Sequence, residues 1–361
     1  MSLNNFEKND TLNNKNGQEK KIISKIYKDN PNIIFNKNLY IQKDLFSEIL
    51  SIEKFDFFTL NNIAYIVIPD YFCLMSNSLF IFKINKYLNL EKQLSLEGHR
   101  APVLLVKNFY DENTNQNYLI SSDKDFLVII WKIISEKSVI IKRAILTKYD
   151  DDIYSGLILF QPYNILILTS IDTNMASTEY DFGTGDFKRN IPGTKNNKTF
   201  YALNYKDLII ELCMDKIYIY NLLNDNDTYL INNDELKGQN NQGCIINDIL
   251  IVNNYSHGKI ILIDLNNKNI LNVIKFKNDC NLWSLTKWNL NYIIVSDIKN
   301  RNIYIIDLSQ KKIINSIKVM INPICIKKIE LNKTIYKKEN NNFLFILGDK
   351  MYFELWNKNN I

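Results

Sequence analysis

The residues best suited to chemistry in this sequence are His99, Ser121 and Asp125, which lie close together along the chain. In a serine hydrolase, the serine attacks the substrate, the histidine accepts its proton and the aspartate orients the imidazole. Such a site also needs donors that stabilise the oxyanion, and no motif for that element accompanies these residues. The three side chains therefore fit either a catalytic triad or a structural hydrogen-bond network.

Other motifs for catalysis or ligand binding are incomplete. The chain has only 2 histidines, which leaves few general bases and metal ligands. The Gly183-Thr184-Gly185 segment lacks the third glycine of a dinucleotide fingerprint and the lysine of a P-loop, so it predicts a turn. Asp150-Asp151-Asp152 lacks the spaced oxygens and glycine of a calcium loop. We therefore expect no cofactor, no metal and no enzymatic activity.

Charge and cysteine usage indicate an intracellular protein. Lys and Arg number 44 against 39 Asp and Glu, and this net charge of +5 is spread along 361 residues, which is no nucleic-acid footprint. The 5 cysteines are scattered and odd in number, and no signal peptide precedes them, which favours a reducing compartment. We expect a cytoplasmic or nuclear location and no secretion. Membrane insertion is not expected, because Asp70 interrupts the most apolar stretch.

Short β-branched or aromatic runs recur at intervals of about 40 to 50 residues, the spacing of propeller repeats. We predict seven third strands, at Leu79–Ile84, Leu127–Ile133, Ser177–Phe182, Lys216–Leu222, Lys259–Leu265, Asn302–Leu308 and Lys350–Trp356. The second strands that precede them are predicted at Ile63–Ile68, Tyr118–Ser122, Asn164–Thr169, Asp207–Cys213, Asp248–Asn253, Asn291–Ser296 and Phe343–Gly348.

One repeat, from Glu97 to Ile133, carries a full set of polar positions: a Gly-His pair, a Ser-rich strand end, an Asp in the next turn and a closing Trp. In these features and their spacing it resembles a WD repeat. The resemblance implies a structural hydrogen-bond chain through His99, Ser121, Asp125 and Trp131, with Ser122 as an alternative to Ser121. The other repeats depart from this pattern, with Ile263 and Ile306 at the Trp position and Tyr220 and Trp356 as variants of the same strand ending.

A single repeat cannot bury its own faces, so these observations predict an all-β, seven-bladed β-propeller of four-stranded antiparallel blades. We expect residues 1–19 to form a disordered tail and residues 20–361 to form the propeller. Ile22–Ile26 resembles a later outer-strand segment and is predicted to close the last blade. The third blade, from Asp151 to Gly193, is the least regular by sequence.

Propellers of this type mostly bind peptides or domains, so the resemblance implies a non-catalytic scaffold in an intracellular protein complex. Arg100, Tyr154 and Trp283 are the predicted anchors, because they lie in or beside loops and are residue types enriched at interfaces. Two alternatives remain: an RNA-associated platform, suggested by the basic balance and by aromatics such as Trp283 and Tyr154, and a propeller enzyme.

Overall fold

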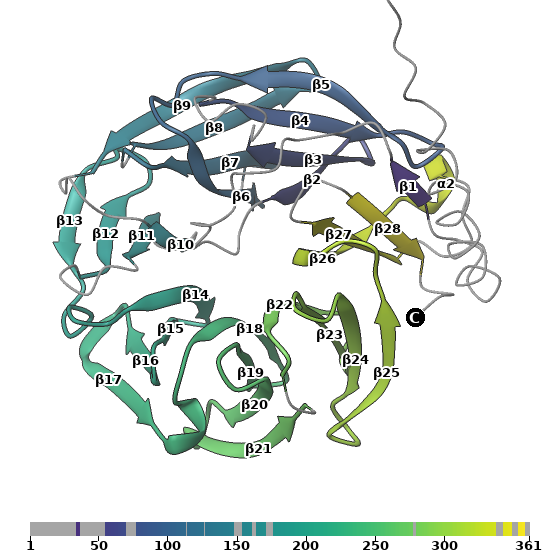
Figure 1. Ribbon diagram of the computed structural model, residues 1–361. Coiled ribbons are helices and arrows are strands. Elements are labelled where there is room, and N and C mark those ends of the chain that lie inside the picture. Colours follow the sequence, from purple (N-terminus) through teal and green to yellow (C-terminus); the bar gives the residue numbers. More distant parts are fainter. Residues whose placement is uncertain are drawn as a thin grey trace, which may run out of the picture.

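The protein is a seven-bladed β-propeller (Figure 1). This computed structural model describes residues 34–36, 55–69, 77–147 except 113 and 126, 154–160, 164–170, 176–336 except 277 and 278, 342–348 and 353–357. Each of its seven sheets contains four antiparallel strands. The predicted tail at residues 1–19 lies outside the described residues.

The strands follow the predicted repeats closely, and we number the blades in chain order. Blade one contains β2 (Asp56–Leu60), β3 (Ile63–Pro69), β4 (Leu79–Ile84) and β5 (Leu90–Leu96). Blade two contains β6 (Val103–Asp111), β7 (Gln116–Asp123), β8 (Leu127–Ser135) and β9 (Ser138–Leu146). Blade three contains β10 (Tyr154–Phe160), β11 (Ile165–Ser170), β12 (Thr178–Asp181) and β13 (Phe187–Asn190). Blade four contains β14 (Thr199–Tyr205), β15 (Leu208–Cys213), β16 (Lys216–Asn221) and β17 (Asn224–Asn232).

The remaining blades repeat the same order. Blade five contains β18 (Asn240–Ile246), β19 (Ile249–Asn254), β20 (Lys259–Asp264) and β21 (Asn269–Lys275). Blade six contains β22 (Leu282–Lys287), β23 (Tyr292–Asp297), β24 (Asn302–Asp307) and β25 (Lys312–Lys318). Blade seven contains β26 (Pro323–Glu330), β27 (Asn342–Gly348), β28 (Phe353–Asn357) and β1 (Ile34–Asn36). The described helical segments are η2 (Asp234–Leu236) and α2 (Lys333–Tyr336).

The first strand of each blade is innermost, because the first strands of neighbouring blades contact one another around the ring. Polar side chains join these inner strands. The carboxylate of Asp56 in β2 accepts the backbone N–H of Asn108 in β6 at 2.7 Å and the Nζ of Lys327 in β26 at 3.0 Å. Between blades six and seven, Ser284 Oγ accepts the N–H of Ile326 at 3.1 Å. These bonds connect adjacent blades near the axis.

The hydrophobic core is divided into seven clusters, each of which lies between two neighbouring blades. The cluster between blades one and seven includes Ile66 and Phe345, and the cluster between blades five and six includes Ile251 and Val295. Both faces of a blade are therefore apolar, and each face is covered by the next blade.

The strand that closes the ring lies elsewhere than predicted. β1 pairs with β28, with Ile34 opposite Leu355 and Asn36 opposite Phe353, so an N-terminal strand supplies the outer edge of blade seven (Figure 1). The predicted segment, Ile22–Ile26, lies outside the described residues. Its sequence similarity to a later outer strand did not identify the segment that pairs with β28. That segment is Ile34–Asn36.

Truncation tests this closure. Removal of residues 1–36 deletes β1 and exposes the edge of β28, so we expect the melting temperature to fall by about 2 to 4 °C for each kcal/mol of lost stability. Removal of residues 1–30 keeps β1 and should leave the melting temperature near that of the full chain. Equal melting of the two truncated proteins in differential scanning calorimetry would contradict this role of β1.

Candidate functional site

The polar residues of blade two form a continuous buried chain of hydrogen bonds. Trp131 Nε1 donates to Ser121 Oγ at 2.8 Å, and Ser121 Oγ lies 2.6 Å from His99 Nε2. The other imidazole nitrogen, Nδ1, lies 2.9 Å from Asp123 Oδ2. The hydrogen-bond chain thus runs from the third strand to the second strand, then to His99 in the segment before β6, and returns to Asp123 at the end of the second strand.

The side chains at the two ends of this network determine which groups donate and which accept the hydrogen bonds. The Trp131 indole can only donate, and an ionised Asp123 can only accept. When the imidazole is neutral, Ser121 donates its hydroxyl proton to His99 Nε2, and His99 donates from Nδ1 to Asp123. Burial alone would raise the pKa of Asp123, but the hydrogen bonds from His99, Leu127 and Arg100 lower it below its ordinary value.

The prediction that Asp125 is the acidic residue of this network is wrong. Asp125 is exposed, whereas Asp123 has a relative exposure of 1% and contacts His99. Asp123 Oδ1 also accepts the backbone N–H groups of Asp125 at 3.0 Å and Leu127 at 2.9 Å, which fixes the turn before β8. Asp123 and Asp125 lie close together in the sequence, and the backbone geometry of the turn brings Asp123 to His99.

The arrangement of Ser121, His99 and Asp123 resembles a catalytic triad, but its surroundings differ. Ser121 has no exposed surface, and His99 is only 6% exposed. The Ser121 oxygen also accepts the indole N–H of Trp131, which occupies part of its hydrogen-bonding capacity. A substrate carbonyl cannot approach this oxygen in the folded protein, so the geometry fits a structural network that joins three parts of the blade.

Blade four places a buried glutamate at the ladder position of Ser121. Next to the bulge in the first strand of each blade, Val106 pairs with Ser121 and Ala202 pairs with Glu211. Across the next ladder, Trp131 corresponds to Tyr220, whose hydroxyl lies 3.3 Å from Glu211 Oε1. An aromatic donor thus contacts an oxygen acceptor in both blades.

The carboxyl of Glu211 also joins two blades. It accepts hydrogen bonds from Ser177 in the segment before β12 at 2.5 Å and from Thr199 in β14 at 2.9 Å. Burial raises the pKa of Glu211, and the three hydroxyl partners offset this rise only in part. Burial likewise raises the pKa of the nearby Cys213 thiol to about 12, so this cysteine is a thiol at neutral pH.

Blade seven uses a third arrangement of the same kind. Trp356 pairs with Leu344 at the position that Trp131 occupies in blade two. Its Nε1 donates to Glu354 Oε2 at 2.9 Å, and Glu354 Oε1 accepts the backbone N–H of Met320 at 3.1 Å. Burial raises the pKa of Glu354 to about 7. Sequence analysis identified Trp356 and Tyr220 as strand endings but missed Glu354 and Glu211, because a charged residue inside a strand does not match the polar pattern of blade two.

Loops that join the outermost strand of one blade to the innermost strand of the next gather on one face of the ring, together with the turns between second and third strands. We call this the loop-bearing face. Trp283 lies in β22 and packs its ring against Tyr255, with ring centroids 5.3 Å apart and an interplanar angle of 83°. Both side chains are partly exposed, and Asn281 Nδ2 donates to the Tyr255 hydroxyl at 3.2 Å. This aromatic pair lies on the loop-bearing side of blades five and six.

The other two predicted anchors lie on other blades than Trp283. Arg100 is exposed on the loop-bearing face at the start of blade two, where its backbone N–H donates to Asp123. Tyr154 begins β10, and its side chain lies outside the described residues. No contact among the described side chains brings these residues together, since they come from three different blades.

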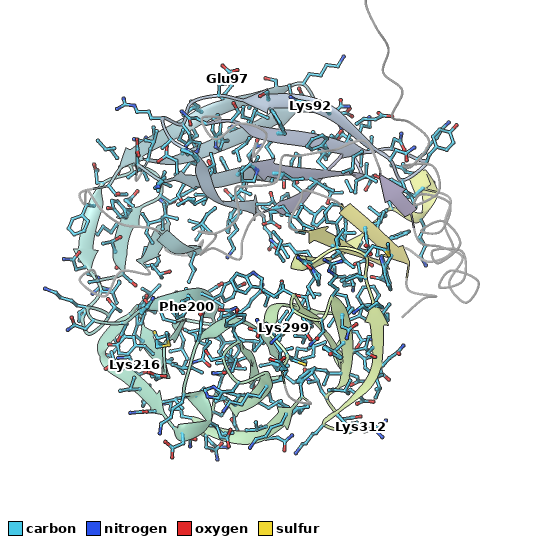
Figure 2. The ribbon with its side chains drawn as sticks, viewed as in Figure 1. Lys92, Glu97, Phe200, Lys216, Lys299 and Lys312 are labelled. Atoms are coloured by element: carbon cyan, nitrogen blue, oxygen red, sulfur yellow. The ribbon has the colours of Figure 1, made fainter. Side chains whose placement is uncertain are left out.

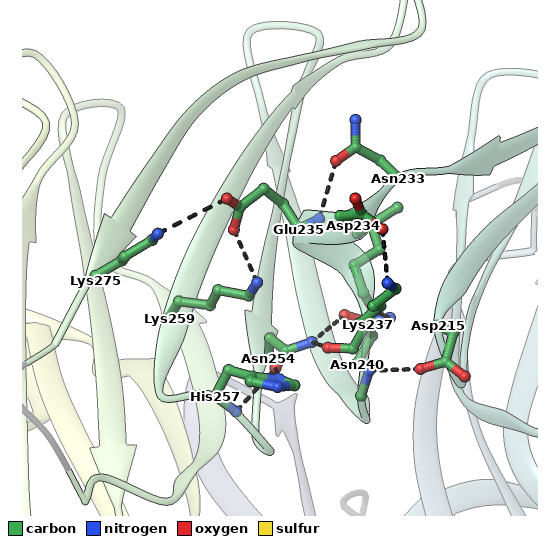
Figure 3. Close-up of polar contacts among 12 residues, drawn as sticks. Asp215, Asn233, Asp234, Glu235, Lys237, Asn240, Asn254, His257, Lys259 and Lys275 are labelled. Carbon is green, nitrogen blue, oxygen red and sulfur yellow. Dashed lines mark hydrogen bonds and ion pairs between the residues drawn. The ribbon is translucent and has the colours of Figure 1, made fainter.

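A polar network shapes the loop-bearing face at blade five (Figure 3). Glu235 accepts a hydrogen bond from Lys259 at 2.8 Å and lies 3.8 Å from Lys275. Asp215 accepts the backbone N–H of Gly238 at 2.6 Å, and His257 Nδ1 lies 3.3 Å from Asn254 Oδ1. The loop that contains η2 is thus tied to two neighbouring blades.

Among the described residues, no three His, Cys, Asp or Glu side chains form a group that could hold a metal ion. None of the described helices is long and apolar enough to cross a membrane. The four cysteines in this part of the chain, Cys213, Cys244, Cys280 and Cys325, are free thiols.

Solved structures share this fold, although no protein-family model and no curated protein sequence matches the chain. Raptor from Chaetomium thermophilum matches with a TM-score of 0.68 and 10% identity over 90% of this chain. The matched region covers 28% of the Raptor chain. BBS1N, solved in complex with ARL6DN, matches with a TM-score of 0.66 and 9% identity, and the match covers 89% of this chain and 94% of BBS1N. At these identities the likeness establishes the fold.

Paired substitutions test the blade-two network. Asp123→Ala should lower the free energy of unfolding by about 1 to 3 kcal/mol, because it leaves His99 Nδ1 without its acceptor. Asp125→Ala changes an exposed carboxylate and should stay within about 0.5 kcal/mol of the wild type. Trp131→Ala should cost about 3 to 5 kcal/mol. Urea unfolding followed by circular dichroism measures all three, and a larger loss for Asp125→Ala would refute the assignment of Asp123.

The raised pKa of Glu354 predicts a pH-dependent stability. Because the folded protein holds this proton up to a pH of about 7, it binds more protons than the unfolded chain above the ordinary pKa of about 4.3. The contribution of Glu354 to stability is therefore complete below that value and declines as the pH rises through about 7. Glu354→Gln has no proton to lose, so its stability relative to the wild type should be higher at pH 8 than at pH 5. Urea unfolding at both pH values provides the comparison, and a constant difference would exclude this titration.

Proposed function

We propose that this chain is a divergent WD-repeat propeller that acts as a non-catalytic scaffold in an intracellular protein complex. The observation that carries this proposal is the partly exposed Trp283–Tyr255 pair on the loop-bearing face. Tyrosine and tryptophan supply large contact areas with little loss of conformational entropy, and they are enriched at interface hot spots. The cytoplasmic or nuclear location, the absence of catalysis and the absence of a cofactor belong to the same proposal.

The fold and its structural neighbours support this proposal. A rigid ring presents a broad surface, and a stable interface needs about 800 Å² from each partner. BBS1N was solved with a partner protein bound, which illustrates that a chain of this fold can bind another protein. The blade-two network favours membership of the WD-repeat family, because a His, a Ser, an Asp and a Trp form a hydrogen-bond chain of the expected kind, with Asp123 in place of Asp125.

The aromatic pair is held in place by polar contacts that do not cover it. Asn253 Nδ2 donates to the backbone carbonyl of Trp283 at 3.0 Å, and Asn281 holds the Tyr255 hydroxyl. On the same face, Lys299, labelled in Figure 2, pairs with Asp279. A preorganised pair of rings loses little entropy when a partner binds, so we expect Trp283 and Tyr255 to contribute more than Arg100 or Tyr154.

Affinity purification of the tagged full chain, followed by mass spectrometry, identifies the partner for a direct test. Trp283→Ala combined with Tyr255→Ala should weaken binding of that partner by at least about tenfold, as expected for hot-spot aromatics. Tyr87→Ala is the matched control, because Tyr87 is 69% exposed and lies in the β4–β5 turn on the opposite face. Calorimetric titration gives the affinities, and melting curves show whether each variant is folded.

Other outcomes of this experiment would overturn the proposal. Unchanged binding by the double variant would place the interface elsewhere. Recovery of RNA whose binding weakens steeply with salt would favour an RNA-associated platform. Turnover of a substrate by the purified chain would establish an enzyme.

A further inference from the structure

An apolar pocket lies between blades five and six on the face opposite the loop-bearing face. It has a volume of about 200 Å³, and it is lined by Ile251 and Leu262 from the inter-blade core and by Leu290 and Leu308 from turns. The lining turns join first to second strands and third to fourth strands, which places the pocket on the opposite face. Its volume is below the roughly 300 to 1,000 Å³ of small-molecule sites, so it suits one large apolar side chain.

Two exposed leucines border the pocket. Leu290 is 59% exposed in the β22–β23 turn, and Leu271 is 42% exposed in β21. Leu271 is turned outward by a β-bulge, because its neighbours in β21 pair with Leu262 and Ile263 while Leu271 has no opposite residue. Burial of these side chains by a partner would remove apolar surface from water.

Hydrogen bonds hold the Leu290 turn in one conformation. Asn289 Oδ1 accepts the backbone N–H groups of Asn291 at 2.8 Å and Tyr292 at 2.9 Å. The N–H of Trp288 donates to the carbonyl of Tyr292 at 3.0 Å and completes the turn. Leu290 is therefore presented on a preorganised support, which lowers the entropic cost of binding.

The charge at the pocket indicates the chemistry of its occupant. Lys311 is the only charged residue among those that line it, and no ion pair joins Lys311 to a carboxylate in the described part of the chain. The acid of the adjacent turn, Asp307, accepts hydrogen bonds within that turn, from Ser309 and Gln310. A carboxylate on the partner would complement this positive border.

We propose that this pocket binds a short linear peptide of a partner protein in which leucines lie beside acidic residues. One leucine enters the pocket against Leu262, a second packs on Leu290 and Leu271, and a carboxylate pairs with Lys311. This site deepens the proposed scaffold function and rests on it, because it gives the ring a second binding surface that is separate from the Trp283–Tyr255 pair.

The test uses the full chain and a fluorescein-labelled synthetic peptide with a pair of leucines followed by a pair of glutamates. Fluorescence anisotropy should show saturable binding, which Leu290→Asp weakens by at least about tenfold. Lys311→Glu should weaken binding several-fold and reduce its dependence on salt, since a rim charge acts mainly through screened attraction.

Matched controls separate this site from general surface effects. Leu230→Asp changes a leucine that is 53% exposed on β17 of blade four, and Lys312→Glu changes the next lysine, labelled at the outer rim in Figure 2. Both should bind the peptide like the wild type. A peptide with serines in place of leucines, and one with lysines in place of glutamates, should bind at least about tenfold more weakly.

Several results would overturn the proposal. These are equal binding by Leu290→Asp and the wild type, no binding of the acidic leucine peptide, or tighter binding of the lysine peptide. Self-association of the wild type that Leu290→Asp abolishes, measured by light scattering, would show instead that a second copy covers this face. The Trp283 and Tyr255 variants retain this pocket. Failure of the peptide test would therefore not contradict the interface on the loop-bearing face, which the partner-binding experiment tests separately.

Discussion

The structure depends on apolar contact between neighbouring blades. Each of the seven core clusters is shared by two blades, so no blade can bury its faces alone. The ring must close for the same reason, because the first and last blades would otherwise expose Ile66 on one side and Phe345 on the other. Pairing of β1 with β28 completes the last blade with a strand from the other end of the chain.

Within the blades, a second structural requirement concerns the side chain near the end of the third strand. A large side chain at this position packs between blades, and any polar atom that it carries needs a partner. Trp131 uses Ser121, Tyr220 uses Glu211 and Trp356 uses Glu354. Ile263 and Ile306 stand at this position in blades five and six, are fully buried and carry no polar side-chain atom. The polar signature can therefore be lost from a blade without loss of the fold, provided that the aromatic residue and its acceptor change together.

The repeat period and the strands were predictable because β-branched runs and turns recur along the chain. The predicted third strand at Leu79–Ile84 coincides with β4, and the one at Lys216–Leu222 differs from β16 by a single residue. Details that depend on tertiary geometry were not predictable. Asp123 and Asp125 fit the same spacing, and only the fold of the turn shows which one reaches His99. The buried carboxyls of Glu211 and Glu354 were missed because their burial depends on side chains from other strands or blades.

The two faces of the ring differ in how their polar groups are used. On the loop-bearing face at blade five, Glu235 and Asp215 bind lysines and backbone N–H groups of the same chain, which fixes the loops around the Trp283–Tyr255 pair. On the opposite face, the turn that contains Leu290 is held by the side chain of Asn289, and Lys311 at the pocket makes no ion pair in the described part of the chain. One face thus offers a rigid aromatic surface and the other offers an apolar pocket with a positive border. Both surfaces lie beside the core between blades five and six, so the partners proposed for the two faces would contact different residues.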